Sequence, residues 1–316
     1  MSAASSGSLE VRFVGQCPPP ARVIFLGGLG RSGSTLLERL LGEVPGVVPL
    51  GEVVHLWARG LIDGEPCGCG VPLPECEFWA EVGRLAFGGW APELAERMIE
   101  LRRRVDRTRR IPPRLTIELV EYVSVYHRLY SAAGEVADSP VVVDSSKHAS
   151  LAFCLAAAGV PVHVVHLVRD PRAVAHSWQR RITRPEDGTP MPRWSPARTA
   201  AHWTTQNLAL ELLAGKGVPV TRVRYEDLLD SPRTAFARLL TRLDLAPRLD
   251  FLTDRQVHLT TAHTASGNPI RFISGAVELV RDDAWRQALP CGQRLLVTAL
   301  TLPLMLQYGY RARAAA

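Results

Sequence analysis

The stretch ARVIFLGGLGRSGSTLLERLLGEV, residues 21–44, decides the fold of this chain. It begins with a short apolar run bounded by glycines, which predicts a buried strand. A glycine-rich turn follows, and then an amphipathic helix that starts near Ser34. Gly28, Gly33, Ser34 and Thr35 match the pattern G-x-x-x-x-G-K-[ST] everywhere except at the lysine, where Ser34 stands. The stretch therefore predicts a phosphate-binding loop that lacks its usual charge.

The missing lysine narrows the choice of ligand. In nucleoside-triphosphate enzymes this lysine reaches the β and γ phosphates, and phosphoryl transfer relies on its charge. A serine in its place disfavours a plain triphosphatase and favours a single phosphate carrying a smaller, less charged group. The alternative is a P-loop kinase or ATPase with an atypical loop that uses Mg·ATP. That alternative would give the metal to Asp144, which ends an apolar strand.

Strands and helices alternate along the rest of the chain. PVVVDSSKH (140–148) predicts a strand that ends in polar residues, VPVHVVHLV (160–168) a strand that ends near Val168, and VPVTRVR (218–224) a further strand, and each precedes a helical pattern. This alternation predicts an α/β fold, a P-loop nucleotide-hydrolase-like three-layer domain with a central, mostly parallel sheet and helical insertions. We expect residues 1–20 to form a loose leader and residues 21–316 to form one domain.

Composition limits the partners and the location of the protein. The net charge of +6 and the pI of about 9.2 favour anionic partners. The arginines are not interleaved with aromatic residues in a recognisable module, so no nucleic acid is expected. No apolar run reaches the roughly 18 residues of a membrane span. The N-terminus MSAASSGSLE lacks the features of a signal peptide, which predicts a cytoplasmic protein.

Four segments in a fixed order resemble one family. They are GRSGSTLL (30–37), HLVRDPRAVAHSW (166–178), RYEDLLDSP (224–232) and SGNPIRF (266–272). This set resembles the sulfotransferases that use 3′-phosphoadenosine 5′-phosphosulfate (PAPS) and release 3′,5′-adenosine bisphosphate (PAP). It is closer to the tyrosylprotein and carbohydrate branch than to the cytosolic phenol and steroid branch, and suggests a bacterial member. The resemblance implies PAPS as the cofactor and a reaction that requires no metal.

The resemblance also implies which residues hold PAPS. The first loop would wrap the 5′-phosphosulfate, Arg169 and Ser177 would hold the 3′-phosphate, and Tyr225 would lie near the nucleotide. The fork of donors on Arg169 suits a terminal phosphate, and the helix predicted to start at Pro171 adds a positive dipole end. The implied cofactor-binding residues are Arg31, Ser32, Gly33, Ser34, Thr35, Leu36, Arg169, Ser177, Tyr225 and Arg271.

Sulfuryl transfer to a hydroxyl needs a general base and donors for the departing oxygen. Glu52, in PLGEVVHLW, is the first candidate for the base, because the tyrosylprotein sulfotransferases carry a glutamate at the corresponding place. His148 and then His55 follow as candidates. Lys147 is interpreted as a stabiliser of the bridging oxygen or the sulfonate, and a plain surface lysine is the alternative. A nucleotide-binding or scaffold protein without catalysis is a further possibility.

The acceptor is expected to be a metabolite, glycolipid or carbohydrate with a free hydroxyl, as in secondary metabolism. Segments 55–133 and 179–205 are the long insertions and are predicted to build its pocket. Their tryptophans could line that pocket, although core packing is the expected role of most. They are Trp57, Trp79, Trp194 and Trp203. The sequence does not indicate the oligomeric state.

Three cysteines gather in CGCGVPLPEC as Cys67, Cys69 and Cys76. No fourth ligand stands at a usual zinc spacing, although His55 could be recruited from upstream. A structural metal, a loop-closing disulfide and free thiols all stay open. A cytosolic location would favour free thiols.

Overall fold

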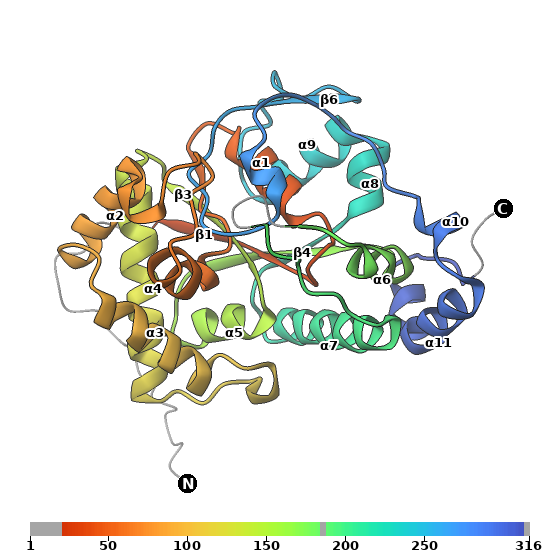
Figure 1. The fold of residues 1–316 in the computed structure, drawn as a ribbon, viewed down its shortest axis with the longest axis horizontal. Helices are drawn as coiled ribbons and strands as arrows, with labels where there is room; N and C mark the ends of the chain where they lie inside the picture. The colour runs from red at the N-terminus through yellow and green to blue at the C-terminus, as the bar shows by residue number, and fades with distance from the viewer. Residues whose placement is uncertain (1–20, 184–187, 313–316) are drawn as a thin grey trace, which may run out of the picture.

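The computed structural model describes residues 21–183 and 188–312; the leader predicted at 1–20 lies outside them. Five parallel strands form the central sheet in the order β2-β3-β1-β4-β5 (Figure 1). They are β1 (Arg22–Gly27), β2 (Val47–Pro49), β3 (Val141–Lys147), β4 (Val162–Val168) and β5 (Val220–Arg224). The prediction of an α/β fold with a central parallel sheet is confirmed.

Helices cover both faces of this sheet, because its strands are apolar on both sides. Ile24 and Leu26 of β1 pack with one set of helices, and Val23 and Phe25 pack with the other set. The first set is α1 (Ser34–Gly42), α8 (Tyr225–Asp230) and α9 (Pro232–Arg242). The second set is α4 (Ile117–Val136), α5 (Ala149–Ala157) and α7 (Pro196–Gly215). Figure 1 shows α1, α8 and α9 above the sheet and α5 and α7 below it.

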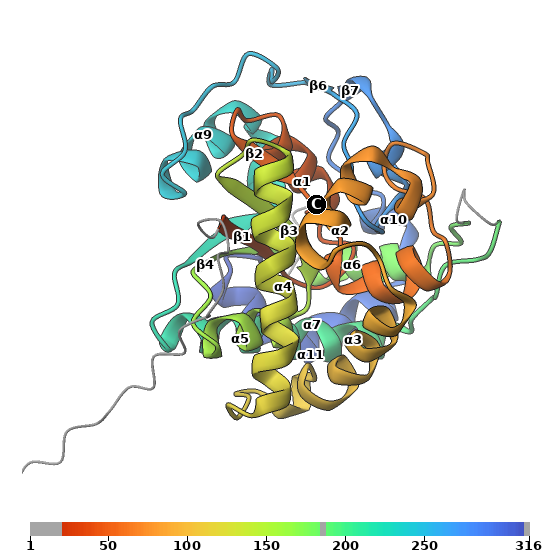
Figure 2. The same ribbon diagram turned by 90° about the vertical axis from the view of Figure 1, so that its left-hand side faces the viewer.

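The remaining elements lie outside these two layers. They are a π-helix (Leu56–Ile62), α2 (Glu77–Phe87), α3 (Pro92–Val105), α6 (Pro171–Gln179), β6 (Gln256–Leu259), β7 (Gly275–Glu278), α10 (Trp285–Ala288) and α11 (Cys291–Gln307). Helices α2 and α3 pack against α4, and α11 packs against α6 and α7. Figure 2 shows α2 and α3 beside α4. In the described part of the chain, no helix combines the length and apolar character needed to cross a bilayer.

Two details depart from the sequence expectations. The sequence from Pro92 to about Ala133 has a helical pattern throughout, which predicts continuous helix, but it folds as the two helices α3 and α4 because Pro112 and Pro113 interrupt it. The sequence after residue 250 has no clear strand or helix pattern before about residue 282. In the structure this segment contains an antiparallel hairpin of β6 and β7, which was not predicted.

The order of the strands fixes where a site can form. β1 lies between β3 and β4, and Gly27 pairs with Lys147 on one side and with His166 on the other. The chain leaves these three strands at the same edge of the sheet, as parallel strands must. The loop after β1, Lys147 at the end of β3 and Arg169 just after β4 are therefore neighbours.

Candidate active site

The loop between β1 and α1 has the geometry of a phosphate loop. Gly28 has a φ of 151°, and a Cβ there would lie 2.5 Å from the carbonyl oxygen of Leu167. Gly33 has a φ of 95°, and a Cβ there would lie 2.5 Å from the ring of Tyr225. Only glycine fits either position. The first turn of α1 follows, and its N-terminal end suits an anion.

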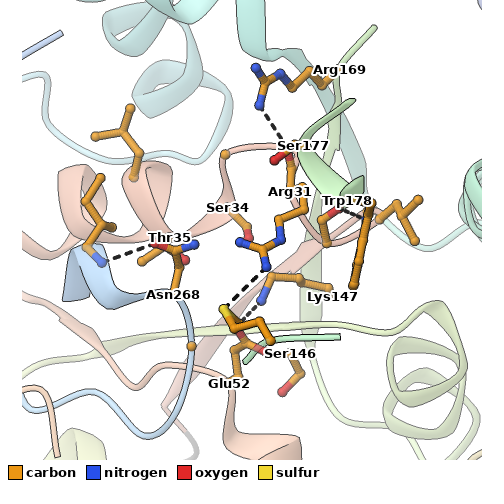
Figure 3. Close-up of a pocket in the computed structure, with 18 of the residues that line it drawn as sticks. Arg31, Ser34, Thr35, Glu52, Ser146, Lys147, Arg169, Ser177, Trp178 and Asn268 are labelled. Atoms are coloured by element: carbon orange, nitrogen blue, oxygen red, sulfur yellow. Dashed lines mark hydrogen bonds and ion pairs between the residues drawn. The ribbon is translucent and has the colours of Figure 1, made fainter. Parts of the chain in front are cut away.

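A cavity of about 890 Å³ opens at this edge of the sheet (Figure 3). Its volume lies within the range of small-molecule sites and would accommodate a nucleotide with part of a second substrate. Most of the predicted site residues line it. These are Arg31, Gly33, Ser34, Thr35, Leu36, Glu52, Lys147, His148, Arg169, Ser177 and Tyr225, together with His55. Segments distant in the sequence thus meet in one cavity.

Lys147 brings a lysine charge to the loop from the neighbouring strand. Its carbonyl oxygen accepts a hydrogen bond from the Gly28 amide at 3.2 Å, so the end of β3 is tied to the start of the loop. Its φ of 69° is left-handed and rare for a residue with a side chain. The ammonium forms an ion pair with Glu52 in the cavity (Figure 3). Lys147 therefore supplies the positive charge that the loop lacks at Ser34, but this charge is paired with the carboxylate of Glu52.

Glu52 lies in a buried, positively charged environment. Burial would raise the pKa of its carboxyl group, but the charge of Lys147, followed by His55 and the Lys147 hydrogen bond, outweighs burial. The net pKa is lowered to about 2, so Glu52 is a carboxylate throughout the neutral range. One carboxylate oxygen pairs with Lys147 and the other lies 3.7 Å from Nε2 of His55. Glu52 can accept a proton, and Lys147 controls how readily it does so.

The two competing histidines are both uncharged near neutral pH. Burial, aided by the charge of Arg102, lowers the pKa of His148 to about 4. Burial also lowers the pKa of His55 to about 3, against the opposing charge of Glu52. Their rings meet edge to face, with centroids 6.2 Å apart. Each imidazole could accept a proton. Neither forms an ion pair with a lysine, as Glu52 does with Lys147, so no loss of such a pair could raise its basicity.

Glu38 of α1 positions both members of the Glu52–Lys147 pair. It is buried, and its carboxylate accepts hydrogen bonds from the Gly51 amide at 2.6 Å and the Ser145 hydroxyl at 2.8 Å. Gly51 precedes Glu52, and Ser145 is two residues before Lys147. Burial raises the pKa of Glu38 to about 7, and the hydrogen bonds to Ser145 and Gly51 oppose this shift. The sequence offered no sign of this role.

Replacing Glu38 by glutamine is expected to stabilise the protein increasingly as pH rises from about 5 to about 8. The folded wild type keeps the proton up to about pH 7, whereas the ordinary pKa is 4.5, so its stability falls across this window. Glutamine carries no charge and can keep both hydrogen bonds. The difference in unfolding free energy between variant and wild type should grow by about 2 kcal/mol. Urea unfolding at about pH 5 and about pH 8 measures the difference in unfolding free energy, with the exposed Glu96→Gln as control. A difference between Glu38→Gln and the wild type that is the same at both pH values would contradict the prediction.

Arg169 has the surroundings expected of an anion site. Its guanidinium stacks on Tyr225 with 4.2 Å to the ring centroid, and it donates to the carbonyl oxygens of Arg31 and Asp282 at 3.1 Å each. Its Nε is buried without a hydrogen-bond partner in the described chain. The carboxylate of Asp282 lies 3.4 Å from Nη2. The buried guanidinium N–H without a partner fits a site for a phosphate, and a phosphate bound there would compete with Asp282 for the charge of Arg169.

Ser177 and Trp178 extend this wall of the cavity from α6. Asp170 caps that helix by accepting from the Arg172 amide at 2.9 Å, and Pro171 follows as its first residue, as the sequence predicted. The Trp178 indole donates to the carbonyl oxygen of Gly30 at 3.0 Å and stacks on Trp194 with centroids 3.8 Å apart. The phosphate loop is thus fixed against an aromatic wall.

Arg271, predicted to contact the cofactor phosphate, is held by contacts within the fold, and its role in cofactor binding stays a prediction. It is only 1% exposed, does not line the cavity, and pairs with Glu65 at 3.0 Å. It also donates to the carbonyl oxygens of Pro66 and Thr264. Asn268 of the same segment lines the cavity instead. Ser32 is 1% exposed and does not line the cavity, so only its backbone amide, as part of the phosphate loop, would be offered to a ligand, as predicted.

Asp144 does not have the setting of a magnesium ligand. Its carboxylate is fully buried beneath the cavity floor and absent from its lining. One oxygen accepts from the Tyr130 hydroxyl at 2.5 Å, and the other accepts from the Ser146 amide and hydroxyl at 2.7 and 2.5 Å. Both oxygens are therefore used within the fold, which removes the observation that favoured the kinase or ATPase alternative.

The two long insertions both reach the cavity. Segment 55–133 contributes Arg59, Arg102 and Thr108, and segment 179–205 contributes Arg180, Met191, Trp194 and His202. The other three tryptophans named from the sequence, Trp57, Trp79 and Trp203, are buried in the core. Arg102 was missed, because it belongs to the basic stretch RMIELRRRVDRTRR (97–110), whose pattern predicts a solvated helix face. Gln206 and Asp282 were also missed, since no motif marks them.

No protein-family model matches the sequence, and no curated protein matches it. Among solved structures, the sulfotransferase domain from the curacin biosynthetic pathway has a TM-score of 0.54 at 17% identity, over 93% of this chain and 99% of that one. The fold is that of a sulfotransferase. The sulfotransferase domain of the olefin synthase from Synechococcus PCC 7002 gives a TM-score of 0.49 at 20% identity, over 94% of this chain and 97% of that one.

The sulfotransferase fold confirms the resemblance at the level of architecture. The alignment with the curacin-pathway domain covers nearly all of both chains, so the likeness concerns the fold as a whole and not one segment. The identity of 17% gives no information on individual site residues. Their roles rest on the geometry of this chain.

Proposed function

We propose that this chain is a PAPS-dependent sulfotransferase that moves a sulfuryl group onto a hydroxyl of a small molecule or glycan. The observation that carries this proposal is the Glu52–Lys147 ion pair beside a phosphate loop whose own lysine is missing. A triphosphate enzyme needs a loop lysine for its phosphates, whereas a base paired with a lysine suits transfer to a hydroxyl. The sulfotransferase fold supports the same reading.

The residues present fit PAPS at both of its ends. The loop from Gly28 to Gly33 and the start of α1 offer backbone donors to a 5′-phosphosulfate. Arg169, with its buried Nε lacking a partner in the described chain, and Ser177 offer donors to a 3′-phosphate. Tyr225 packs against Gly33 of the loop and against the guanidinium of Arg169, and so sets the spacing between the two proposed phosphate sites.

PAPS supplies the sulfuryl group, whose bond from sulfur to the 5′-phosphate oxygen breaks as the acceptor oxygen bonds to sulfur. Glu52 takes the proton of the acceptor hydroxyl. Lys147 shifts its hydrogen bond from Glu52 to the departing phosphate oxygen, which gains negative charge. As Lys147 leaves, the pKa of Glu52 rises, because burial then acts without its opposing charge. Release of the lysine and strengthening of the base are therefore one event.

The acceptor is proposed to enter between the insertions 55–133 and 179–205. Both insertions contribute side chains to the cavity, and the stacked pair of Trp178 and Trp194 provides a flat apolar wall. Arg59, Arg102 and Arg180 also line the cavity, each near a carboxylate, and offer N–H donors to polar groups of an acceptor. A metabolite, glycolipid or carbohydrate stays the proposed class, and a cytoplasmic location stays a prediction.

Calorimetric titration with PAP and with Mg·ATP tests the cofactor. PAP is expected to bind without metal at a micromolar Kd, about −8 kcal/mol, and more tightly than Mg·ATP. Arg169→Ala removes charge-assisted hydrogen bonds to the 3′-phosphate and should weaken PAP binding about thirtyfold, or ~2 kcal/mol. Arg242→Ala, an exposed arginine on α9, is the matched control and should bind PAP like the wild type.

The two outcomes separate the candidate functions. Binding of Mg·ATP alone, with no effect of Arg169→Ala, would contradict the sulfotransferase proposal and restore the kinase or ATPase alternative. Binding of PAP, without turnover of PAPS on any hydroxyl acceptor, would indicate a nucleotide-binding protein instead.

A further inference from the structure

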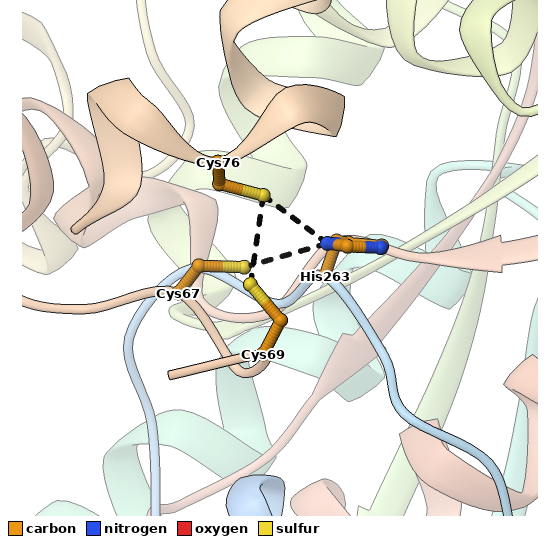
Figure 4. A group of neighbouring side chains, drawn as sticks. All are labelled: Cys67, Cys69, Cys76 and His263. Atoms are coloured by element: carbon orange, nitrogen blue, oxygen red, sulfur yellow. Dashed lines mark hydrogen bonds between the residues drawn. The ribbon is translucent and has the colours of Figure 1, made fainter. Parts of the chain in front are cut away.

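Three cysteines and one histidine gather outside the active-site cavity. Cys67 and Cys69 lie on a turn after the π-helix, Cys76 lies at the start of α2, and His263 comes from the segment after β6. The histidine is 187 residues from Cys76 in sequence. Figure 4 shows the three sulfur atoms and the imidazole turned toward one another. His55, proposed from the sequence as a partner for the cysteines, lies in the active-site cavity instead.

The separations of the four ligand atoms match the edges of a metal tetrahedron. The four atoms lie within 4.8 Å of one another. Sγ of Cys69 and Sγ of Cys76 are 3.7 Å apart, and Nδ1 of His263 lies 3.1 Å from Cys76 and 3.9 Å from Cys67. A tetrahedral Zn²⁺ with Zn–S of about 2.3 Å and Zn–N of about 2.0 Å sets S···S near ~3.8 Å and S···N near ~3.5 Å.

The backbone around the ligands is built for a close approach. The Gly68 amide donates to the carbonyl oxygen of Thr264 at 2.9 Å, and a Cβ at Gly68 would lie 2.5 Å from the carbonyl oxygen of Ala262. The cysteine turn is thus pressed against the residues on both sides of His263. Phe78 stacks on the imidazole, with centroids 5.5 Å apart and planes inclined by 22°. These contacts fix the ligand ring and the turn independently of any metal.

We propose that Cys67, Cys69, Cys76 and His263 form a structural zinc site. Three thiolates and an imidazole are the soft donor set that selects zinc over magnesium or calcium. All four positions of a tetrahedron are filled by protein, which is typical of a structural site and leaves no open position for substrate. Of the alternatives left open by the sequence, a disulfide between Cys69 and Cys76 does not fit, because their sulfur atoms are 3.7 Å apart and an S–S bond is about 2.05 Å. Free thiols without metal are an outcome of the test below.

The site would brace the backbone of the proposed base. Ala265, two residues after His263, accepts from the Glu52 amide at 2.7 Å, and its own amide donates to the carbonyl oxygen of Leu50 at 2.8 Å. A metal at His263 therefore connects the cysteine turn of the 55–133 insertion to the segment that holds Glu52. The metal takes no part in the transfer itself, which agrees with a reaction that requires none.

The metal content of the purified full-length wild type tests the site directly. We expect one zinc per chain by elemental analysis. Cobalt added to the metal-free, reduced protein should give the thiolate charge-transfer band and the intense visible bands of tetrahedral Co²⁺. Cys69→Ser and His263→Ala should each lower the zinc content and the melting temperature, because bound metal stabilises the folded state. Cys291→Ser, at an exposed cysteine at the start of α11, should retain zinc and the wild-type melting temperature.

The wild-type measurements decide the matter even if a variant fails to fold. A wild type that carries no zinc, and gives no tetrahedral cobalt spectrum when reduced, would overturn the proposal. A mass lower by two hydrogens, with Cys69 and Cys76 found in one cross-linked peptide, would replace the zinc site by a disulfide. PAP binding is measured separately, so failure of the zinc proposal would leave the sulfotransferase proposal standing.

Discussion

Replacing Glu52 by glutamine is expected to lower kcat about a thousandfold while PAP binding stays within twofold of the wild type. Glutamine keeps the size of the side chain and its place beside Lys147, but it cannot accept the proton of the acceptor hydroxyl. The phosphate loop and Arg169 are untouched, so the cofactor should bind normally. Steady-state transfer from PAPS, measured beside PAP calorimetry on the same protein, separates the loss of the base from a loss of binding.

Three further variants make this result specific. Glu96→Gln removes an exposed carboxylate on α3 and should leave turnover unchanged. His148→Asn and His55→Asn each remove a neutral imidazole from the cavity and should lower kcat far less than Glu52→Gln. A thousandfold loss in His148→Asn, with near-normal turnover in Glu52→Gln, would assign the proton transfer to His148 instead.

The sequence predicted the parts of the fold that depend on local pattern. The apolar run before Gly28, the serine in place of the loop lysine and the RDP segment at 169–171 each have a short-range signal. Such signals place a loop or a helix start at the end of a strand, and the rules for parallel sheets then bring those ends together. For this reason the sequence alone indicates that Arg31, Lys147 and Arg169 lie at one edge of the sheet, and all three line the cavity.

The parts that depend on contacts between distant segments could not be predicted. Glu38 has the appearance of an ordinary polar residue on an amphipathic helix, and only folding brings Gly51 and Ser145 to its carboxylate. His263 is one of nine histidines, and no spacing rule connects it with cysteines almost two hundred residues earlier. Arg271 matched a motif, yet in the folded chain its guanidinium pairs with Glu65 of an insertion. In each case the contact joins two segments that no spacing rule of the sequence connects.

Replacing Lys147 by methionine is expected to lower kcat about a hundredfold and to move the acidic limb of the kcat/KM profile to higher pH. The loss in kcat follows because the departing phosphate oxygen loses its cationic donor. The shift of the limb follows from the electrostatics of the free enzyme. Burial raises the pKa of Glu52 and Lys147 is the first opposing influence, so without this lysine the pKa rises from about 2. The carboxyl group then takes up a proton at a higher pH, and activity falls earlier on acidification.

The chain provides its own control, because Lys216 is its other lysine and is exposed at the end of α7. Lys216→Met should keep both the wild-type rate and the wild-type pH profile. Lys147→Arg keeps the positive charge beside Glu52, so its acidic limb should stay near that of the wild type even if the longer side chain lowers kcat. A loss of kcat in Lys147→Met without any shift of the limb would mean that Lys147 acts on the leaving oxygen alone. Release of the lysine would then not strengthen the base, and the coupling of the two steps through the Glu52–Lys147 pair would be wrong.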